Sequence, residues 1–120
     1  MRSRILAITC ASLLILTLVL VQKEQGPTIR FPDGSIIHLA LARTQQEQER
    51  GLSGRAVLPE DEGMLFLHSR RTIQRYWMKG MLIPIDIIWI DGDIIVGFEA
   101  HVPLPATSLP IYPSPVPVDL

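Results

Sequence analysis

The chain begins with a short basic segment that is followed by a long apolar run. Arg2 and Arg4 precede an uncharged stretch from Ile5 to Val21, which ends at the polar residues Gln22-Lys23-Glu24-Gln25. The length of this stretch is at the short end of the roughly 17 to 25 residues that cross a bilayer. Because basic residues flank the cytoplasmic end of such a helix, the pattern predicts a single-pass membrane protein whose C-terminal domain is extracytoplasmic.

A cleaved signal peptide is the alternative interpretation, because it too has a basic start and an apolar stretch. The sequence just after Val21 contains no A-x-A-like cleavage site. We therefore expect residues 1–25 to form a signal anchor that contacts the membrane through residues 5–21. Export after signal cleavage is the second interpretation.

The remainder of the chain, residues 26–120, alternates apolar and polar residues in the manner of strands broken by turns. Thr28 to Phe31 leads into Pro32-Asp33-Gly34-Ser35, whose residue types favour a tight turn. The strand that follows, Ile36 to Ala42, has large apolar side chains at alternate positions from Ile37 to Leu41. These two strands are predicted to form a hairpin with one buried face.

A short helix is predicted after this hairpin. Thr44 and Glu47 have the spacing of a capping box, in which each side chain bonds the other residue's backbone amide. Gln45 to Arg50 are good helix formers, and Gly51 suits the left-handed position that ends a helix.

Further strands and a proline-rich tail complete the prediction. The strands are expected at residues 64–67, 73–78, 82–90 and 94–102, with a tight hairpin at Asp91-Gly92-Asp93 between the last two. Six of the chain's 10 prolines lie between Pro103 and Pro117, which predicts an extended tail with few backbone donors. Residues 26–120 are thus expected to form a mainly β (α+β) domain, an antiparallel β-sandwich or barrel-like fold with one short helix.

Composition and charge exclude several classes of function. The chain has 11 basic and 12 acidic residues and a net charge of -1, so nothing favours binding to nucleic acid. Cys10 is the single cysteine, and no cysteine or histidine spacing suits a metal. We therefore expect neither a metal site nor a cofactor. Serine-nucleophile motifs and phosphate-binding glycine loops are also missing from the sequence.

Five motifs occur in an order that resembles the domain of unknown function 192 (DUF192) family. The resemblance extends from about Ile37 to Val118 and implies a compact, mostly β domain with a small helix, commonly exported and without an established biochemical activity. The motifs are Glu49-Arg50-Gly51-Leu52-Ser53-Gly54-Arg55, Glu60-Asp61-Glu62-Gly63-Met64-Leu65-Phe66, Tyr76-Trp77-Met78-Lys79, Ile83-Pro84-Ile85-Asp86-Ile87-Ile88-Trp89-Ile90-Asp91 and Tyr112-Pro113.

The chain departs from this family in two places. Gly80 stands where the family often has asparagine, and such domains usually continue beyond the position of Leu120 into a final strand. A missing strand would leave a sheet edge open to pairing with another chain. Either the sequence is truncated, or a partner protein supplies a strand at the open edge.

Asp86 is the strongest candidate for chemistry, because it interrupts an apolar face of the strand predicted at residues 82–90. Burial can raise the pKa of a carboxyl group into the range that suits acid or base catalysis. The structural alternative is an ion pair, or a carboxylate that caps nearby backbone amides, and this is the commoner case.

Four other residues are candidate ligand contacts. Trp77 and Lys79 lie two positions apart on a predicted strand, so they share a face and could present an aromatic platform beside a cation to a sugar or an anion. Arg50 and Arg55 lie next to glycines and could bind a carboxylate or phosphate. Holding the acidic loop Glu60 to Glu62 in place is the commoner role for such arginines.

Two functional hypotheses follow from these residues. The first is a membrane-tethered binding or interaction module of the cell envelope, with an unknown ligand and no catalytic residue. The second is a small hydrolase or lyase in which Asp86 works with Lys79 or Arg50. The absence of a nucleophile-base pattern favours the first, so an enzyme is not expected.

Overall fold

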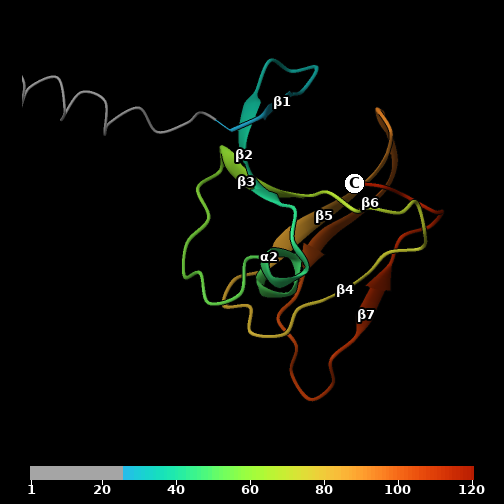
Figure 1. The fold of residues 1–120 in the computed structure, drawn as a ribbon. Helices are drawn as coiled ribbons and strands as arrows, with labels where there is room; N and C mark the ends of the chain where they lie inside the picture. Colours follow the sequence, from blue (N-terminus) through green and yellow to red (C-terminus); the bar gives the residue numbers. More distant parts are fainter. Residues whose placement is uncertain (1–25) are drawn as a thin grey trace, which may run out of the picture.

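The computed structural model describes residues 26–120, and the transmembrane segment predicted at residues 5–21 lies outside the described residues. Within the described range, no helix is long and apolar enough to cross a membrane. The elements, shown in Figure 1, are β1 (Thr28–Arg30), β2 (Ile36–Ala42), α2 (Gln45–Arg50), β3 (Glu62–Phe66), β4 (Arg75–Trp77), β5 (Ile85–Asp91), β6 (Ile94–Val102) and β7 (Ile111–Pro113).

The strands form three small open sheets. Their orders are β1-β2-β3, β4-β7 and β5-β6. The prediction of a mainly β fold with one short helix is confirmed, whereas the barrel-like alternative is wrong because the sheets do not close on one another. Pairing is not wholly antiparallel either, since β2 and β3 run parallel.

The first hairpin forms as predicted. The amide of Gly34 donates to the carbonyl of Phe31 at 2.9 Å, and Asp33 Oδ1 accepts the amide of Ser35 at 2.9 Å. Gly34 has a φ of 89°, a conformation that glycine adopts without steric cost. In β2, Leu39 is buried while His38 and Ala40 are exposed, as the predicted alternation requires, but Ala42 at the end of the strand is fully buried on the face predicted to be outward.

Helix α2 connects the parallel strands β2 and β3 and has the predicted caps. Thr44 Oγ1 accepts the amide of Glu47 at 3.2 Å, and Glu47 Oε2 accepts the amide of Thr44 at 3.0 Å. Gly51 ends the helix with a φ of 50° and donates its amide to the carbonyl of Glu47. The backbone hydrogen bonds of Glu47 lower its pKa below the ordinary value, as expected for a carboxylate that accepts amides.

The hairpin of β5 and β6 is confirmed, but β6 contains two bulges. Between the pairs Ile85–Val102 and Ile87–Glu99, β5 advances two residues while β6 advances three. A second shift occurs beyond the pair Trp89–Gly97. At the first bulge, His101 has a φ of 52°, which is uncommon for a residue other than glycine.

The tail contains a strand that the sequence did not predict. Strand β7 pairs antiparallel with β4, and beyond it Val118 is fully buried and bridges Thr72. Pro115 packs so closely against β6 that a Cβ at Gly97 would come within 2.7 Å of its ring. The prolines therefore do not prevent the tail from covering the β5-β6 sheet.

Ser114 forms hydrogen bonds that connect this tail to Gln74, the residue before β4. Its buried hydroxyl accepts the amide of Gln74 at 3.1 Å and donates to the carbonyl of Val116 at 2.7 Å. A buried amide that loses its acceptor keeps its full desolvation cost. The hydroxyl is thus a structural link between two segments 40 residues apart in sequence.

The substitution Ser114→Ala tests this link. We expect it to lower the free energy of unfolding by about 1 to 3 kcal/mol, because the amide of Gln74 is left unsatisfied. Ser108→Ala is the matched control, since Ser108 is exposed in the same tail and should change stability by less than about 0.5 kcal/mol. Equal unfolding midpoints for the two variants in urea would contradict the assigned role.

Candidate functional site

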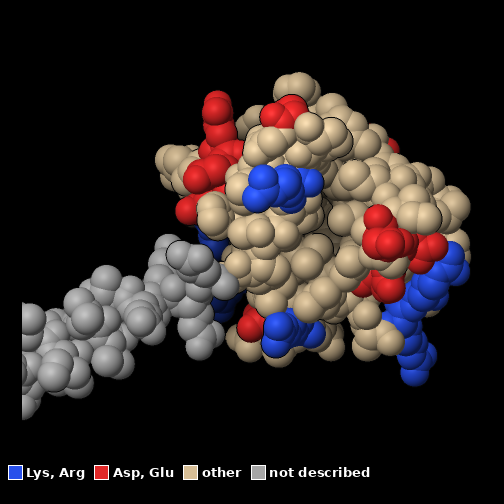
Figure 2. Space-filling view, turned by 90° about the horizontal axis from the view of Figure 1, so that it is seen from above, with Lys and Arg blue, Asp and Glu red and all other residues tan. Residues whose placement is uncertain are grey.

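A large hollow of about 1100 Å³ occupies the middle of the described domain. Its walls come from β3, β4, β5 and the segment after α2, and most of the lining side chains are apolar. This volume lies slightly above the roughly 300 to 1000 Å³ typical of ligand pockets. Figure 2 shows one face of the molecule, on which uncharged atoms predominate and the charged residues lie in separate small groups.

The structure brings four of the five candidate residues to this hollow. Arg50, Trp77, Lys79 and Asp86 line it, whereas Arg55 does not. These four come from the end of α2, from β4 and the residues just after it, and from β5. These residues are spread over positions 50 to 86 of the sequence, and the fold brings them to one hollow.

Trp77 and Lys79 lie together, although β4 ends at Trp77 and Lys79 belongs to the turn that follows it. The Trp77 side chain is 52% exposed, and Lys79 Nζ is 5.8 Å from the centroid of its ring. That separation is within the roughly 6 Å of a cation–π contact. Met78 between them is 1% exposed and anchors the segment in the core.

Gly80 fixes the end of this segment. It has a φ of 73°, and its carbonyl accepts the amide of Gly54 at 2.9 Å. Asparagine also tolerates positive φ better than most residues. The replacement of asparagine by glycine at this position therefore preserves the turn, and the turn joins the loop after α2 to the Trp77 segment.

The arginines do not hold the acidic loop, so that expectation is wrong. Within residues 26–120 the one ion pair joins Arg71 to Asp91, with Nη2 at 2.5 Å from Oδ2 and Nε at 2.7 Å from Oδ1. The hydrogen bond from Arg71 lowers the pKa of Asp91 below its ordinary value. Arg50 and Arg55 are exposed.

Asp86 is exposed rather than buried, which corrects the prediction of a carboxylate desolvated on an apolar face. Its Oδ1 accepts the backbone amide of His101 at 2.8 Å, at the first bulge of β6. This is the structural alternative, a carboxylate that caps a backbone amide. The bulge turns the strand while Asp86 satisfies the amide that the ladder leaves unpaired.

Sequence reasoning missed an aromatic wall of the hollow. The Tyr76 ring lies 5.0 Å from that of Phe66 and 5.3 Å from that of Trp89, centroid to centroid. Trp89 is 2% exposed, and its indole N–H finds no acceptor within the described residues. The signal available in the sequence was only that each aromatic residue lies in a short apolar strand.

His68 joins this wall through Tyr76. Its Nε2 is 2.6 Å from the Tyr76 hydroxyl, and burial raises the pKa of that hydroxyl well above its ordinary value. Burial also lowers the pKa of His68, an effect that the nearby charge of Asp119 partly opposes. The hydrogen bond to Tyr76 gives His68 a structural role in this wall.

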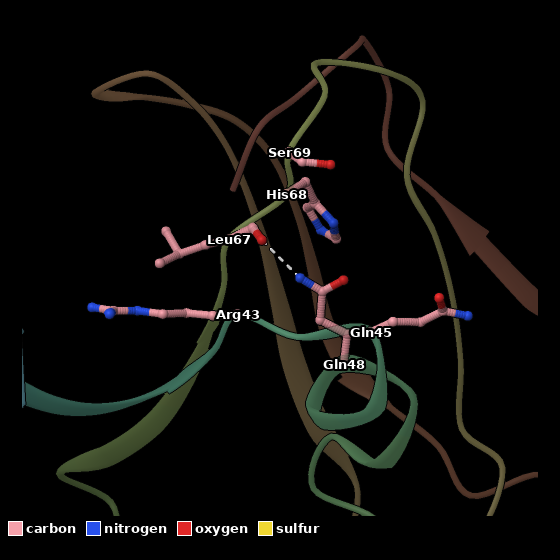
Figure 3. Close-up of a pocket in the computed structure, with 6 residues that line it drawn as sticks. All are labelled: Arg43, Gln45, Gln48, Leu67, His68 and Ser69. Atoms are coloured by element: carbon pink, nitrogen blue, oxygen red, sulfur yellow. Dashed lines mark hydrogen bonds between the residues drawn. The ribbon is translucent and has the colours of Figure 1, made fainter.

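A smaller pocket of about 550 Å³ lies beside His68 (Figure 3). Gln48 crosses it and donates from Nε2 to the carbonyl of Leu67 at 2.7 Å and to that of Ala42 at 3.2 Å. The side chain thus ties α2 to the ends of β2 and β3. Its amide nitrogen is already used by these two carbonyls, and the polar side chains of Arg43, Gln45 and Ser69 line the rest of the pocket.

The titratable side chains and the apolar lining of the hollow differ in what they offer. Across the described part of the chain, no three metal-ligating side chains gather. Asp86 already accepts a backbone amide, and the one hydrogen-bonded pair of titratable side chains outside the ion pair is His68 with Tyr76. The hollow instead combines apolar walls with an exposed indole and a cation at Trp77 and Lys79.

Comparison with known proteins gives a family and a fold but no activity. The model of the DUF192 family, described as an uncharacterized ACR, matches residues 28–119. A protein of unknown function from Novosphingobium aromaticivorans DSM 12444 is similar, with a TM-score of 0.68 and 30% identity over 76% of this chain. The match covers 65% of that protein, less than two thirds of its length.

A second solved structure has the same fold. It is a protein from Sinorhizobium meliloti 1021, provisionally described as a transcription regulator, with a TM-score of 0.67 and 25% identity over 77% of this chain and 72% of that one. No curated protein matches the sequence. The two structures support the mainly β fold described above.

The pH dependence of stability tests the environment of His68. The pKa of His68 is lowered in the folded protein, so the unfolded chain, with a pKa near the ordinary 6.5, takes up a proton first as the pH falls. Above the unfolded pKa of about 6.5, His68 is neutral in both states and its contribution to stability is complete. This contribution is lost as the pH falls from there through the lowered pKa of the folded state. We expect the unfolding midpoint to decline over this interval, and His68→Gln to flatten the decline.

His38→Gln is the control for this measurement, because His38 is an exposed histidine of β2. The carboxyl groups with lowered pKa, Asp33, Glu47 and Asp91, titrate in a more acidic interval. A pH profile of His68→Gln that matches the wild-type profile would show that burial does not perturb this histidine.

Proposed function

The chain belongs to the DUF192 family, and from this premise we propose that it is a membrane-tethered, extracytoplasmic binding module of the cell envelope. The observation that carries the proposal is the apolar hollow of about 1100 Å³ beside the exposed pair Trp77 and Lys79. The family is described as uncharacterized, and a fold alone does not define a function, so the residues of the site support this proposal.

The hollow supports binding because of its size and its lining. Burial of apolar surface contributes roughly 25 cal/mol for each Å² removed from water, so apolar walls of this extent can supply most of the affinity for an apolar ligand. Polar groups then fix its orientation. The lining has three basic side chains, Arg50, Arg75 and Lys79, and four acidic ones, Glu49, Glu60, Glu62 and Asp86, so a preference for an anionic group is confined to the neighbourhood of Lys79.

Trp77 supports the same proposal. An indole that is 52% exposed while its neighbour Met78 is 1% exposed leaves a large apolar surface in water, and such side chains are frequent at recognition sites. The cation of Lys79 near the ring adds electrostatic attraction for an anion. Together they form a recognition edge beside the hollow.

The tether is supported by the apolar run at residues 5–21 and the basic residues that precede it. Such a segment would hold the domain at the outer face of the membrane. The chain offers a direct test, because Cys10 is its single cysteine.

To test the topology, Cys10→Ser and Ser108→Cys are combined so that one exposed position carries the thiol. We expect a membrane-impermeant maleimide to label intact spheroplasts, and the labelled protein to stay in the membrane fraction after carbonate washing. Labelling only after lysis would contradict an extracytoplasmic domain, and release by carbonate would contradict the tether. The Cys10→Ser protein alone is the unlabelled control.

The second candidate is a hydrolase or lyase that uses Asp86 with Lys79 or Arg50. One observation favours it, since all three side chains line the same hollow. Two observations weigh against it, because Asp86 is exposed and its Oδ1 already caps the amide of His101. Turnover of an ester or lactone that disappears in Asp86→Asn with an intact fold would reverse this preference.

Binding at the hollow is tested with naphthoate, whose aromatic rings match the apolar walls and whose carboxylate can approach Lys79. In calorimetry on the full chain in lipid nanodiscs, with empty nanodiscs subtracted, Trp77→Ala should weaken binding by roughly 2- to 10-fold, since an aromatic contact contributes about 0.5 to 1.5 kcal/mol. Phe98→Ala is the matched control, because Phe98 is 56% exposed and lies outside the hollow. Equal loss in both variants, or no binding by the wild type, would contradict the proposed site.

A further inference from the structure

The small sheet of β4 and β7 has one face toward the protein and one toward water. The two strands lie side by side at the edge of the domain (Figure 1), and in each the middle residue is half-buried while the residues on either side are exposed. Trp77 lies directly opposite Ile111, and Arg75 lies opposite Pro113. Directly opposed side chains in a strand pair share a face. We define the outer face as these four exposed residues.

The outer face carries large apolar side chains in water. Trp77 is about half exposed, and Ile111 opposite it is 56% exposed. Leu109, two residues before Ile111, is also exposed. The solvated face of an antiparallel sheet is usually polar, and contiguous exposed apolar residues indicate an interaction surface. The composition of the outer face is therefore that of a surface that contacts something other than water.

The chain segments that supply the outer face carry only positive charge. Neither residues 63–85 nor residues 100–118 include an aspartate or a glutamate. Arg75 and Lys79, both exposed, lie on either side of Trp77 along the chain, and Lys79 Nζ lies over its ring. Among the described residues, neither cation forms an ion pair. An exposed indole between two free cations complements a partner that is apolar in its interior and anionic at its surface.

We propose that the outer face docks on an anionic lipid bilayer. Indole rings favour the boundary between headgroups and acyl chains, because the ring is apolar and its N–H donates a hydrogen bond. Ile111 adds apolar surface beside Trp77. Lysine and arginine side chains lay their stems along apolar surface and place their charges among the lipid phosphates. Each such cation near an anionic bilayer favours docking by about 5-fold.

This inference rests on the proposed tether, which keeps a bilayer within reach and so favours lipid over a soluble acidic protein. It goes beyond the proposed function, because it assigns a second membrane contact to the folded domain itself. Trp77 also lines the hollow, so docking brings the rim of the hollow to the bilayer.

The two tryptophans of the chain give docking a direct optical readout. The full chain is placed in nanodiscs of phosphatidylcholine and phosphatidylglycerol whose acyl chains either carry bromine, which quenches an indole at close range, or lack it. We expect the emission of the wild type to fall in the brominated discs. Trp77→Phe should show no fall, because the remaining indole, Trp89, is buried in the core.

Ile111→Glu tests the outer face at a residue that does not line the hollow. We expect it to lose the quenching, because it removes apolar surface and because a negative charge near anionic lipid lowers the ratio of docked to free domain by about 5-fold. Ile95→Glu is the matched control, since Ile95 is 57% exposed and belongs to β6. It should be quenched like the wild type, and unfolding in urea checks that both variants are folded.

The other outcomes separate this inference from the proposed function. Wild-type emission that bromine leaves unchanged would overturn docking, and binding of naphthoate by the same protein would leave the proposed binding function in place. Equal quenching in discs of phosphatidylcholine alone would overturn the attraction to anionic lipid, and equal loss of quenching in Ile95→Glu would overturn the assignment to the outer face. Shielding of Trp77 from aqueous acrylamide without quenching by bromine would show contact with a protein, such as a second copy, and would also overturn lipid docking.

Discussion

Contacts among three aromatic rings hold the domain together, because its three sheets share no strand. Phe66 belongs to β3, Tyr76 to β4 and Trp89 to β5, so each sheet contributes one ring. Tyr76 lies in the middle, nearly perpendicular to Phe66 at 80° and tilted by 53° from Trp89. The Phe66–Tyr76 contact is edge-to-face, and aromatic pairs add about 0.5 to 1.5 kcal/mol beyond the burial of the rings. The same rings form a wall of the hollow, and the site therefore depends on the contact that holds the sheets together.

The C-terminal tail also connects the sheets, through one buried side chain and a few hydrogen bonds. Val118 is fully buried, Ser114 bonds the start of β4, and Leu120 pairs with β5. A tail rich in proline has few amides to offer, so its hold on the domain depends on a small number of well-placed groups. The hydroxyl of Ser114 and the backbone of the last residues therefore stabilise the attachment of the tail to β4 and β5.

Local chemistry was predictable from the sequence, and long-range arrangement was not. The turn at residues 32–35, the capping box of Thr44 and Glu47, the helix end at Gly51 and the strand at residues 94–102 depend on neighbouring residues, and all were confirmed. The parallel pairing of β2 with β3 and the pairing of β4 with β7 depend on distant segments, for which one sequence holds little signal. Asp86 illustrates the limit, because alternation placed it on an apolar face, whereas the bulge opposite draws its carboxylate to the amide of His101.

In the candidate site, too, the local features were predictable from the sequence and the long-range arrangement was not. The pairing of Trp77 with Lys79 was predictable because both lie on one short segment, but their place beside the hollow was not. The hollow is lined by residues of β3, β4 and β5, which belong to three different sheets, so it depends on how distant segments assemble. Its apolar walls, and the indole N–H of Trp89 that has no acceptor within residues 26–120, are costs that a folded domain bears only where something offsets them. A ligand that removes the apolar walls from water would offset part of this cost.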